Sequence, residues 1–412
     1  MPVTAWRPCG AVLAVVFCAQ SVGATPLRLT MDEAVERATA ASLDLGANRK
    51  DITVAEASVE RSRALLPANP FFSVGAQHAS GFAPNYSFTL SQEFEVAGQR
   101  RKRLSVAQQE LEKAIWDVKT AEQTLAATVK TAFIHALVSA DRVTVAQQGL
   151  DAANDLAGKL EQHKSSSDAQ RIDFNLARMQ AIRAGREVAA AEHARDNALG
   201  VLRRLLALPF DEKIELAGAP GSDIVELPSE TDLVDRALRK RPDLTAFRHS
   251  VQRADLHLAL TTRAAIPNIT LSGLVSRFEG STLVGGDVGV PLPIFQRKTA
   301  EIHEAVAEHD RTSLQVQDLE REIEKEVREA HRACVVAAGD LQAHQRDLVP
   351  KSEENLEIER RRYARGDVTV AELVGLQIDL VTARQEYLDA LETYNTTLIE
   401  LNRVTGGSLA AN

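Results

Sequence analysis

The side chains that could carry out catalysis or bind a metal ion are scattered along the sequence. Ten histidines are present, but no two of them lie four residues apart, the spacing that places two imidazoles on one face of a helix. Three methionines, including the initiator, are too few for a row of thioether ligands to a soft metal. The sequence has no glycine-rich phosphate loop, nucleophile elbow or metalloprotease helix. We therefore predict that the protein is not an enzyme and has no cofactor and no metal site.

Two polar turns are the first candidates for a functional site. They consist of Ser165, Ser166, Ser167 and Asp168 in the first half of the chain, and of Arg365, Gly366, Asp367, Val368 and Thr369 in the second. Asp168 and Asp367 could form a ring of carboxylates around a constriction and so favour cations. Gly366 could supply the positive φ angle that a tight turn requires. Serine, aspartate and glycine are common in any turn, so ordinary turn formation explains the individual residues equally well.

Basic residues at the start of two predicted helices are the second candidate. Gln99 is followed by Arg100, Arg101, Lys102 and Arg103, and Gln296 is followed by Arg297 and Lys298. Positive charge in the first turn of a helix opposes the helix dipole, so its presence needs a reason. A position beside a membrane, facing anionic headgroups, would supply one. A solvated face paired with acidic neighbours would explain the cluster equally well.

The composition limits the classes of protein to which the chain can belong. Its 412 residues carry a formal net charge of −9, so no general positive field attracts nucleic acid, and we expect no nucleic-acid partner. Beyond the N-terminal segment, no stretch is apolar for the roughly 18 residues that a membrane-spanning helix requires. The sequence therefore argues against both a nucleic-acid-binding protein and a polytopic helical membrane protein.

Residues 1–24 are interpreted as a signal peptide for export. Arg7 precedes an apolar run, Ala11–Ala19, and Val22–Ala24 offers small residues for cleavage. A retained membrane anchor is the alternative, but the apolar run is short and ends in small and polar residues.

The cysteines agree with this interpretation. Cys9 and Cys18 lie in the predicted signal, so only Cys334 remains after cleavage and no internal disulfide is expected. Cys18 follows Phe17, where lipoprotein signals carry a small residue, which disfavours lipidation.

The rest of the chain consists of two copies of one unit. Leu233–Ala237 repeats the pattern of Ala34–Ala38 with an offset of 199 residues. Each copy is predicted to contain a helix, a pair of strands, a very long helix, a turn and a return helix. The first repeat covers 25–208, with strands at about 70–95 and the turn at about 163–168. A linker covers 209–228. The second repeat covers 229–412, with strands at about 268–292 and the turn at about 364–369.

The helices are expected to extend far beyond a compact domain. From Ala97 to about Gln162 there is no proline, and apolar or small residues recur at alternating spacings of three and four, which is typical of a coiled coil. At 1.5 Å per residue, such a helix is on the order of 100 Å long. A shorter helix is predicted before it over 31–66, and the second repeat is predicted to have one long helix to about Tyr363.

The predicted strands have the length of membrane-crossing strands. Tyr86, Phe88 and Leu90 alternate with serine and threonine, which is typical of a strand with one apolar face. Strands of about 9–11 residues can cross a bilayer when tilted. Because open sheet edges are not tolerated in lipid, and the smallest barrels have about eight strands, four strands per chain require at least a dimer. A small soluble sheet that caps a helical bundle is the alternative.

Three segments carry a family resemblance. They are Phe94–Arg101, Val290–Arg297, and Arg361–Leu373 with its continuation at Tyr394-Asn395 and Leu401–Gly407. Together they resemble the TolC-type outer membrane factors, the exit ducts of tripartite efflux and secretion systems. The first two segments are most similar to the subgroup of heavy-metal (cobalt-zinc-cadmium and copper-silver) efflux systems of the resistance-nodulation-division class. The resemblance covers essentially the whole chain after the predicted signal.

The resemblance implies a fold that is mainly α with transmembrane β. Three identical chains with four strands each would share one twelve-stranded barrel in the outer membrane of a Gram-negative bacterium, above a long α-helical barrel in the periplasm. The resemblance implies a passive duct for heavy-metal cations that works with a periplasmic adaptor and an inner-membrane pump. The helical turns of the duct would contact the adaptor and form the gate. Multidrug efflux or type I protein secretion is the alternative role, and a soluble periplasmic coiled-coil adaptor is a more distant one.

Overall fold

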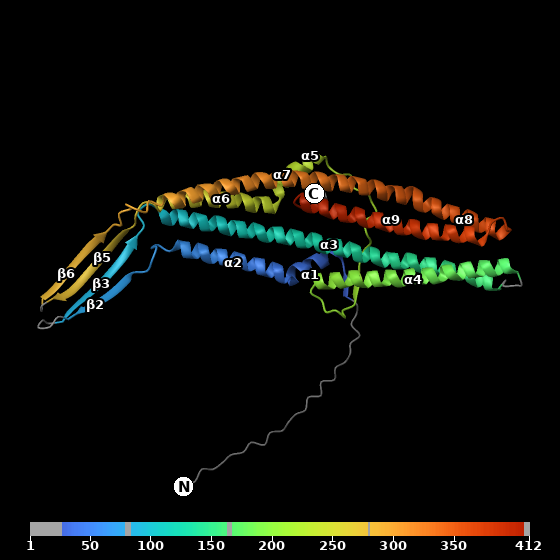
Figure 1. The fold of residues 1–412 in the computed structure, drawn as a ribbon, viewed down its shortest axis with the longest axis horizontal. Helices are drawn as coiled ribbons and strands as arrows, with labels where there is room; N and C mark the ends of the chain where they lie inside the picture. Colours follow the sequence, from blue (N-terminus) through green and yellow to red (C-terminus); the bar gives the residue numbers. More distant parts are fainter. Residues whose placement is uncertain (1–26, 79–83, 163–166, 279–280, 408–412) are drawn as a thin grey trace, which may run out of the picture.

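The structure is a computed structural model that describes residues 27–78, 84–162, 167–278 and 281–407. The predicted signal peptide lies outside these ranges. The described chain forms a long rod, with a four-stranded sheet at one end and two helical turns at the other (Figure 1). Within these ranges, no helix is both long enough and apolar enough to cross a membrane.

The first half of the chain supplies two strands of the sheet and the longest helix. Its elements are β1 (Leu27–Leu29), α1 (Met31–Ala41), α2 (Leu43–Arg63), β2 (Phe71–Gln77), β3 (Asn85–Phe94), α3 (Gln99–Gln162) and α4 (Asp168–Leu205). A short strand, β4 (Ile214–Leu216), follows and pairs in parallel with β1. The predicted linker therefore contributes one strand to a small two-stranded sheet midway along the rod.

The second half repeats this order of elements. They are α5 (Glu230–Lys240), α6 (Pro242–Arg263), β5 (Ile269–Phe278), β6 (Ser281–Gly289), α7 (Thr299–Ala343), a π-helical turn (His344–Leu348), α8 (Val349–Arg365) and α9 (Val370–Val404). The four-stranded sheet has the order β2-β3-β5-β6, and all its neighbours are antiparallel. The contact between β3 and β5 joins the two repeats.

The single helix predicted over 31–66 is in fact two helices. Thr30 and Glu33 form a capping box at the start of α1. Ser42 ends α1 and caps α2, because its Oγ accepts a hydrogen bond from the backbone N–H of Leu45 at 3.2 Å. Serine at such a position offers the backbone an alternative to continuing the helix. The second repeat breaks at the matching place, where Pro242 opens α6.

The long helix of the second repeat is also interrupted, contrary to the prediction. The π-helical turn ends at Leu348, directly before α8, whose second residue is Pro350. Proline has no N–H to donate, and its ring displaces the carbonyl four residues before it. The wider π-helical turn accommodates that displacement, because the backbone N–H of Val349 donates to the carbonyl of His344 rather than to that of the residue after it.

Small apolar clusters hold the helices together along the rod. Phe133 is at the centre of the cluster that joins α1, α3 and α4, and Tyr394 at the centre of the cluster that joins α3, α5, α7 and α9. Alanine supplies many of the other buried side chains. Small side chains allow helix axes to approach closely, which explains how the fold is built with only 4% aromatic residues.

One buried ionic cluster lies where α5 meets α6. Arg241, whose side chain is 8% exposed, donates to the two carboxylate oxygens of Asp243 at 3.0 and 2.7 Å and forms an ion pair with Glu326 of α7. Burial lowers the pKa of Arg241, but the two carboxylates outweigh it and leave the pKa raised. Burial raises the pKa of Asp243, but Arg241 outweighs it and leaves that pKa lowered. The contact between Arg241 and Asp243 therefore favours the charged form of both side chains.

Candidate functional site

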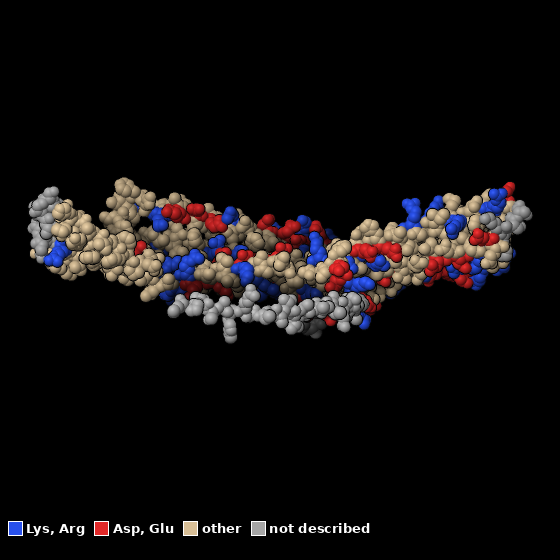
Figure 2. All heavy atoms as spheres, turned by 90° about the horizontal axis from the view of Figure 1, so that it is seen from below, with Lys and Arg blue, Asp and Glu red and all other residues tan. Residues whose placement is uncertain are grey.

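The four-stranded sheet has one apolar and one polar face. Residues paired across antiparallel strands point to the same side, so the register assigns each side chain to a face. The apolar face carries Phe72, Val74, Tyr86, Phe88, Leu90, Leu271, Val275, Val284 and Val288. The polar face carries Ser73, Ser87, Thr89, Ser91, Ser272, Ser276 and Asp287, with Phe71, Leu274 and Leu283 as exceptions. Charged side chains gather on the helices and are almost absent from the strands (Figure 2).

On the two inner strands of the sheet, the apolar face is more exposed than the polar face. Along β3, Tyr86, Phe88 and Leu90 are exposed, whereas Ser87 and Thr89 between them are half-buried, and β5 shows the same alternation. The rings of Phe72 and Phe88 stack on the outer, apolar side with their centroids 6.4 Å apart. One polar face and one exposed apolar face are what a segment of a membrane barrel with a wet interior requires.

Both edges of the sheet lack a partner strand within the described ranges. β2 and β6 each pair with one neighbour only. They run in opposite directions, because the three pairings between them are all antiparallel. The free edge of β6 can therefore pair with the free edge of β2 in another copy and extend the same antiparallel pattern.

A chain of amide hydrogen bonds attaches the sheet to the helices. Gln99, the first residue of α3, is 4% exposed; its Nε2 donates to Asn268 Oδ1 at 3.0 Å, and its Oε1 accepts from the N–H of Ala97 at 2.9 Å. Asn268 in turn donates to Glu93 Oε1 at 2.7 Å. Glu93 and Gln99 belong to the first repeat and Asn268 to the second, so this junction also connects the repeats. Sequence reasoning noted Gln99 only as part of a motif and did not predict this contact.

The basic clusters divide into paired and unpaired side chains. Arg100 donates to the carbonyls of Arg63 at 2.7 Å and Ala64 at 3.1 Å, at the C-terminus of α2, and Arg103 forms an ion pair with Glu95. These partners explain why positive charge is tolerated at the start of α3. The side chains without a hydrogen bond or ion pair to any described residue are Arg101, Lys102, Arg297 and Lys298.

Both helical turns lie at the end of the rod opposite the sheet (Figure 1). Ser165 and Ser166 fall outside the described residues. Ser167 caps α4 by accepting from the N–H of Gln170 at 3.3 Å. The Asp168 side chain is 96% exposed and lies 3.7 Å from Arg171. This turn therefore presents its carboxylate to solvent.

The second turn is more constrained than the first. Gly366 ends α8 with φ of 82°, a conformation that side-chain-bearing residues rarely adopt. Arg365 Nε donates to Asp367 Oδ2 at 2.9 Å, so this carboxylate already has a counter-ion. Val368 is half-buried, and Thr369 caps α9 in a capping box with Glu372. Each turn residue that the structure describes thus has a local structural role.

A contact close to the turns was missed by sequence reasoning. Ala177 of α4 and Leu356 of α8 share one apolar cluster, so α8 lies beside α4. Burial, and to a smaller extent the nearby charge of Asp173 on α4, raise the pKa of Tyr363. Tyr363 also packs on the apolar cluster at this end of the rod. In the sequence, Tyr363 stands out as an aromatic residue next to a run of arginines. No rule of spacing, however, connects Tyr363 with Asp173.

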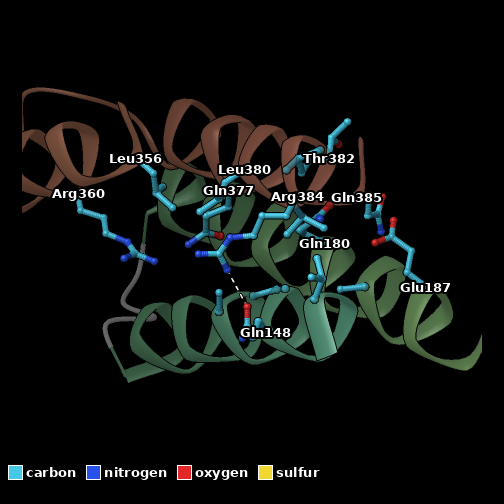
Figure 3. A pocket seen from close by; sticks show the side chains of 17 residues that line it. Gln148, Gln180, Glu187, Leu356, Arg360, Gln377, Leu380, Thr382, Arg384 and Gln385 are labelled. Carbon is cyan, nitrogen blue, oxygen red and sulfur yellow. Dashed lines mark hydrogen bonds between the residues drawn. The ribbon is translucent and has the colours of Figure 1, made fainter. Parts of the chain in front are cut away.

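A groove of about 420 Å³ separates the α3–α4 hairpin from the α8–α9 hairpin (Figure 3). Arg384 of α9 bridges it: one guanidinium nitrogen donates to Gln148 of α3 and another to Glu353 of α8, both at 2.7 Å. The remaining lining combines aliphatic side chains with glutamines and Arg360. Polar contacts therefore join the two hairpins along this stretch. In the parts of the chain that the structure covers, no group of three or more His, Cys, Asp or Glu side chains is arranged to hold a metal.

The sequence is similar to outer membrane proteins of efflux systems. Residues 233–407 match the outer membrane efflux protein family. The cobalt-zinc-cadmium resistance protein CzcC of Cupriavidus metallidurans is 21% identical, over 92% of this chain and 90% of that protein. The toluene efflux pump outer membrane protein TtgF of Pseudomonas putida is 24% identical, over 86% of this chain and 75% of that protein.

Solved structures share the whole architecture. The channel CusC has a TM-score of 0.78 at 17% identity, covering 92% of both chains. The open state of the Neisseria gonorrhoeae outer membrane channel MtrE has a TM-score of 0.78 at 20% identity, covering 92% of this chain and 89% of that one. The predicted fold of a single chain, mainly helical with a four-stranded sheet between long helices, is confirmed.

Proposed function

We propose that this protein, in which residues 233–407 form an outer membrane efflux protein domain, is the outer membrane exit duct of a tripartite efflux system. The observation that carries the proposal is the four-stranded sheet at the end of the rod, with one exposed apolar face and one polar face. The apolar face suits contact with lipid, and the polar face suits a water-filled lumen. MtrE, which has a similar fold, is named as an outer membrane channel, and we propose that transport through this duct is likewise passive.

We infer that three copies close the barrel. Pairing β6 of one copy with β2 of the next repeats the same rotation each time and closes a ring without a free edge. Two copies would give eight strands, a barrel whose interior is filled by its own side chains. Three copies give twelve strands and leave room for a lumen.

The assembly is tested on the purified protein. We expect it to fractionate with the outer membrane, to require detergent for extraction, to show three times the mass of one chain in native mass spectrometry, and to conduct ions in a planar bilayer. A protein released with the soluble periplasmic fraction that forms no channel would contradict the proposal and favour the periplasmic adaptor.

The two ends of the rod are assigned different partners. The turns around Asp168 and Asp367 project at the end farthest from the sheet, and we assign them to the gate and to contact with a periplasmic adaptor that connects the duct to an inner-membrane pump. The unpaired basic side chains beside the sheet are assigned to the lipid headgroups of the membrane surface; they are Arg101, Lys102, Arg297 and Lys298.

Heavy-metal cations are the proposed cargo. This assignment is supported by the similarity to CzcC, which is named for resistance to cobalt, zinc and cadmium. Organic compounds are the second candidate, because the relative TtgF is named as part of a toluene efflux pump.

Deleting the gene is expected to sensitise the host selectively to zinc, cobalt and cadmium, because the pump then has no exit through the outer membrane. Growth in graded concentrations of these metals, beside toluene and several antibiotics, measures the effect. Sensitivity to the organic compounds alone would contradict the metal assignment and leave the duct in place.

The same strain tests the turns. Wild-type protein is expected to restore metal resistance, whereas Asp168→Asn/Asp367→Asn is expected to restore less of it at equal abundance, because the cation-favouring charge at the turns is removed. The matched control is Asp211→Asn, an exposed carboxylate in the linker. Equal resistance with all three proteins would contradict a role for the turn carboxylates.

A further inference from the structure

Only three charged residues lie on the four strands of the main sheet. They are Glu93 on β3, Arg277 on β5 and Asp287 on β6. The register places Arg277 opposite Tyr86 on the apolar face, at the end of the sheet away from the helices. Glu93 and Asp287 lie on the polar face, near the end that joins the helices. Both charges on the proposed lumen wall are therefore negative.

The two carboxylates differ in their contacts. Glu93 accepts a hydrogen bond from Asn268 at 2.7 Å and belongs to the junction between sheet and helices. Asp287 is exposed and makes no hydrogen bond or ion pair with any residue that the structure describes. The junction explains why Glu93 is present, but no contact with a described residue explains Asp287.

The surroundings of Asp287 are open and polar. It lies opposite Ser272 in the register, and Ser272 lies opposite Ser91. On its own strand, the neighbours on the same face are Gly285 and Gly289, which have no side chains. The carboxylate is therefore the only side chain on this part of the polar face of β6, with hydroxyl groups beside it and no basic group on that face.

We propose that Asp287 is a charge-selectivity residue of the duct. This inference rests on the proposed function. When copies of the chain close the barrel with the polar face inward, each contributes one Asp287 at the same height, and the carboxylates form a ring on the lumen wall. A ring of like charge in a lumen with low-dielectric walls raises the local concentration of cations and repels anions.

This ring is independent of the helical turns. Asp287 lies two residues from the end of β6 that joins the helices, whereas Asp168 and Asp367 lie at the far end of the rod. Asp367 is also paired with Arg365, which weakens its field, whereas Asp287 has no such partner in the described part of the chain. The sheet would thus favour cations even while the turns are rearranged by a partner.

The test measures the reversal potential of the full-length protein in planar bilayers under a gradient of dilute KCl, where screening is weak. Wild-type protein is expected to prefer K⁺ over Cl⁻. Asp287→Cys is expected to shift the reversal potential toward that of a non-selective pore. A negatively charged methanethiosulfonate applied to the barrel side restores the wild-type value, and a positively charged one shifts it further toward anions.

Two controls separate the possible outcomes. Val288→Cys lies next in the chain but on the apolar face, so the reagents should leave its reversal potential unchanged. Wild-type protein should also be unaffected, because Cys334 is buried. A conducting Asp287→Cys channel with the wild-type reversal potential, insensitive to both reagents, would overturn the inference while leaving the duct intact. A wild-type protein that never conducts would overturn the proposed function, and this inference with it.

Discussion

Replacing Phe88 by lysine is expected to prevent most of the protein from assembling in the outer membrane. Phe88 is in the row Val74–Phe88–Val275–Val284, which crosses all four strands on the apolar face near the middle of the sheet. A lysine facing lipid near the middle of the bilayer costs about 2–4 kcal/mol in a barrel. In a trimer this cost arises in every copy. The measurement is the amount of folded oligomer in the outer membrane fraction.

The matched control is the next residue in the chain. Thr89 lies between Ser73 and Leu274 on the polar face, where lysine would point into a water-filled lumen. Thr89→Lys is therefore expected to assemble at close to the wild-type level, with only its conductance changed. If both variants assemble normally, the apolar face does not contact lipid, and the soluble cap becomes the better interpretation of the sheet.

Replacing Arg241 by methionine is expected to destabilise the helical rod strongly. The substitution leaves the carboxylates of Asp243 and Glu326 without their counter-ion in a partly buried site. Removing one partner of a buried ion pair typically costs about 3–5 kcal/mol. The temperature at which the helical circular-dichroism signal is lost measures the effect, and methionine keeps most of the packing volume.

Arg248 provides a control on the same pair of helices. It pairs with Glu320 at 2.9 Å, but both side chains are well exposed, so Arg248→Met should cost less than about 1 kcal/mol. Adding Asp243→Asn and Glu326→Gln to Arg241→Met should recover part of the lost stability, because no unpaired charge then remains. Equal melting temperatures for Arg241→Met and Arg248→Met would show that the cluster is no more stabilising than a surface pair.

The Arg241 cluster also responds to pH. Its contacts lower the pKa of Asp243 below the ordinary carboxyl value, so the stabilisation is complete above that ordinary value. It is lost as the pH falls through the lowered pKa and the carboxylate becomes protonated.

Local patterns predicted most of the elements because their causes are local. Alternation at Tyr86, Phe88 and Leu90 indicated a strand with one apolar face, and the structure places these three residues on one face of β3. The absence of proline after Ala97 indicated a very long helix, and α3 continues to Gln162. Interruptions were harder to predict. Ser42 begins a new helix only because its hydroxyl caps Leu45, and a serine within a helical pattern has no single outcome.

The surroundings of the candidate site residues depended much more on contacts between segments that are far apart in the sequence. The basic run after Gln99 indicated a membrane surface or a solvated face, yet Arg100 caps the carbonyls of Arg63 and Ala64 on a separate helix. Asp168 and Asp367 looked equivalent in the sequence, but only Asp367 is held by a neighbouring arginine at short range. Such partners are set by how helices pack side by side, which no local spacing encodes.

The sequence by itself determined the repeated order of helices and strands, the polar turns and the apolar face of each strand, because periodicity and capping act within a few residues. Only the tertiary structure decided that β3 pairs with β5, and therefore that the two repeats share one sheet with a polar and an apolar face. It also placed Asp287 on the polar face without a partner among the described residues. Pairing between strands almost two hundred residues apart depends on long-range packing and on the exclusion of water from the apolar face, and these act only in the folded chain.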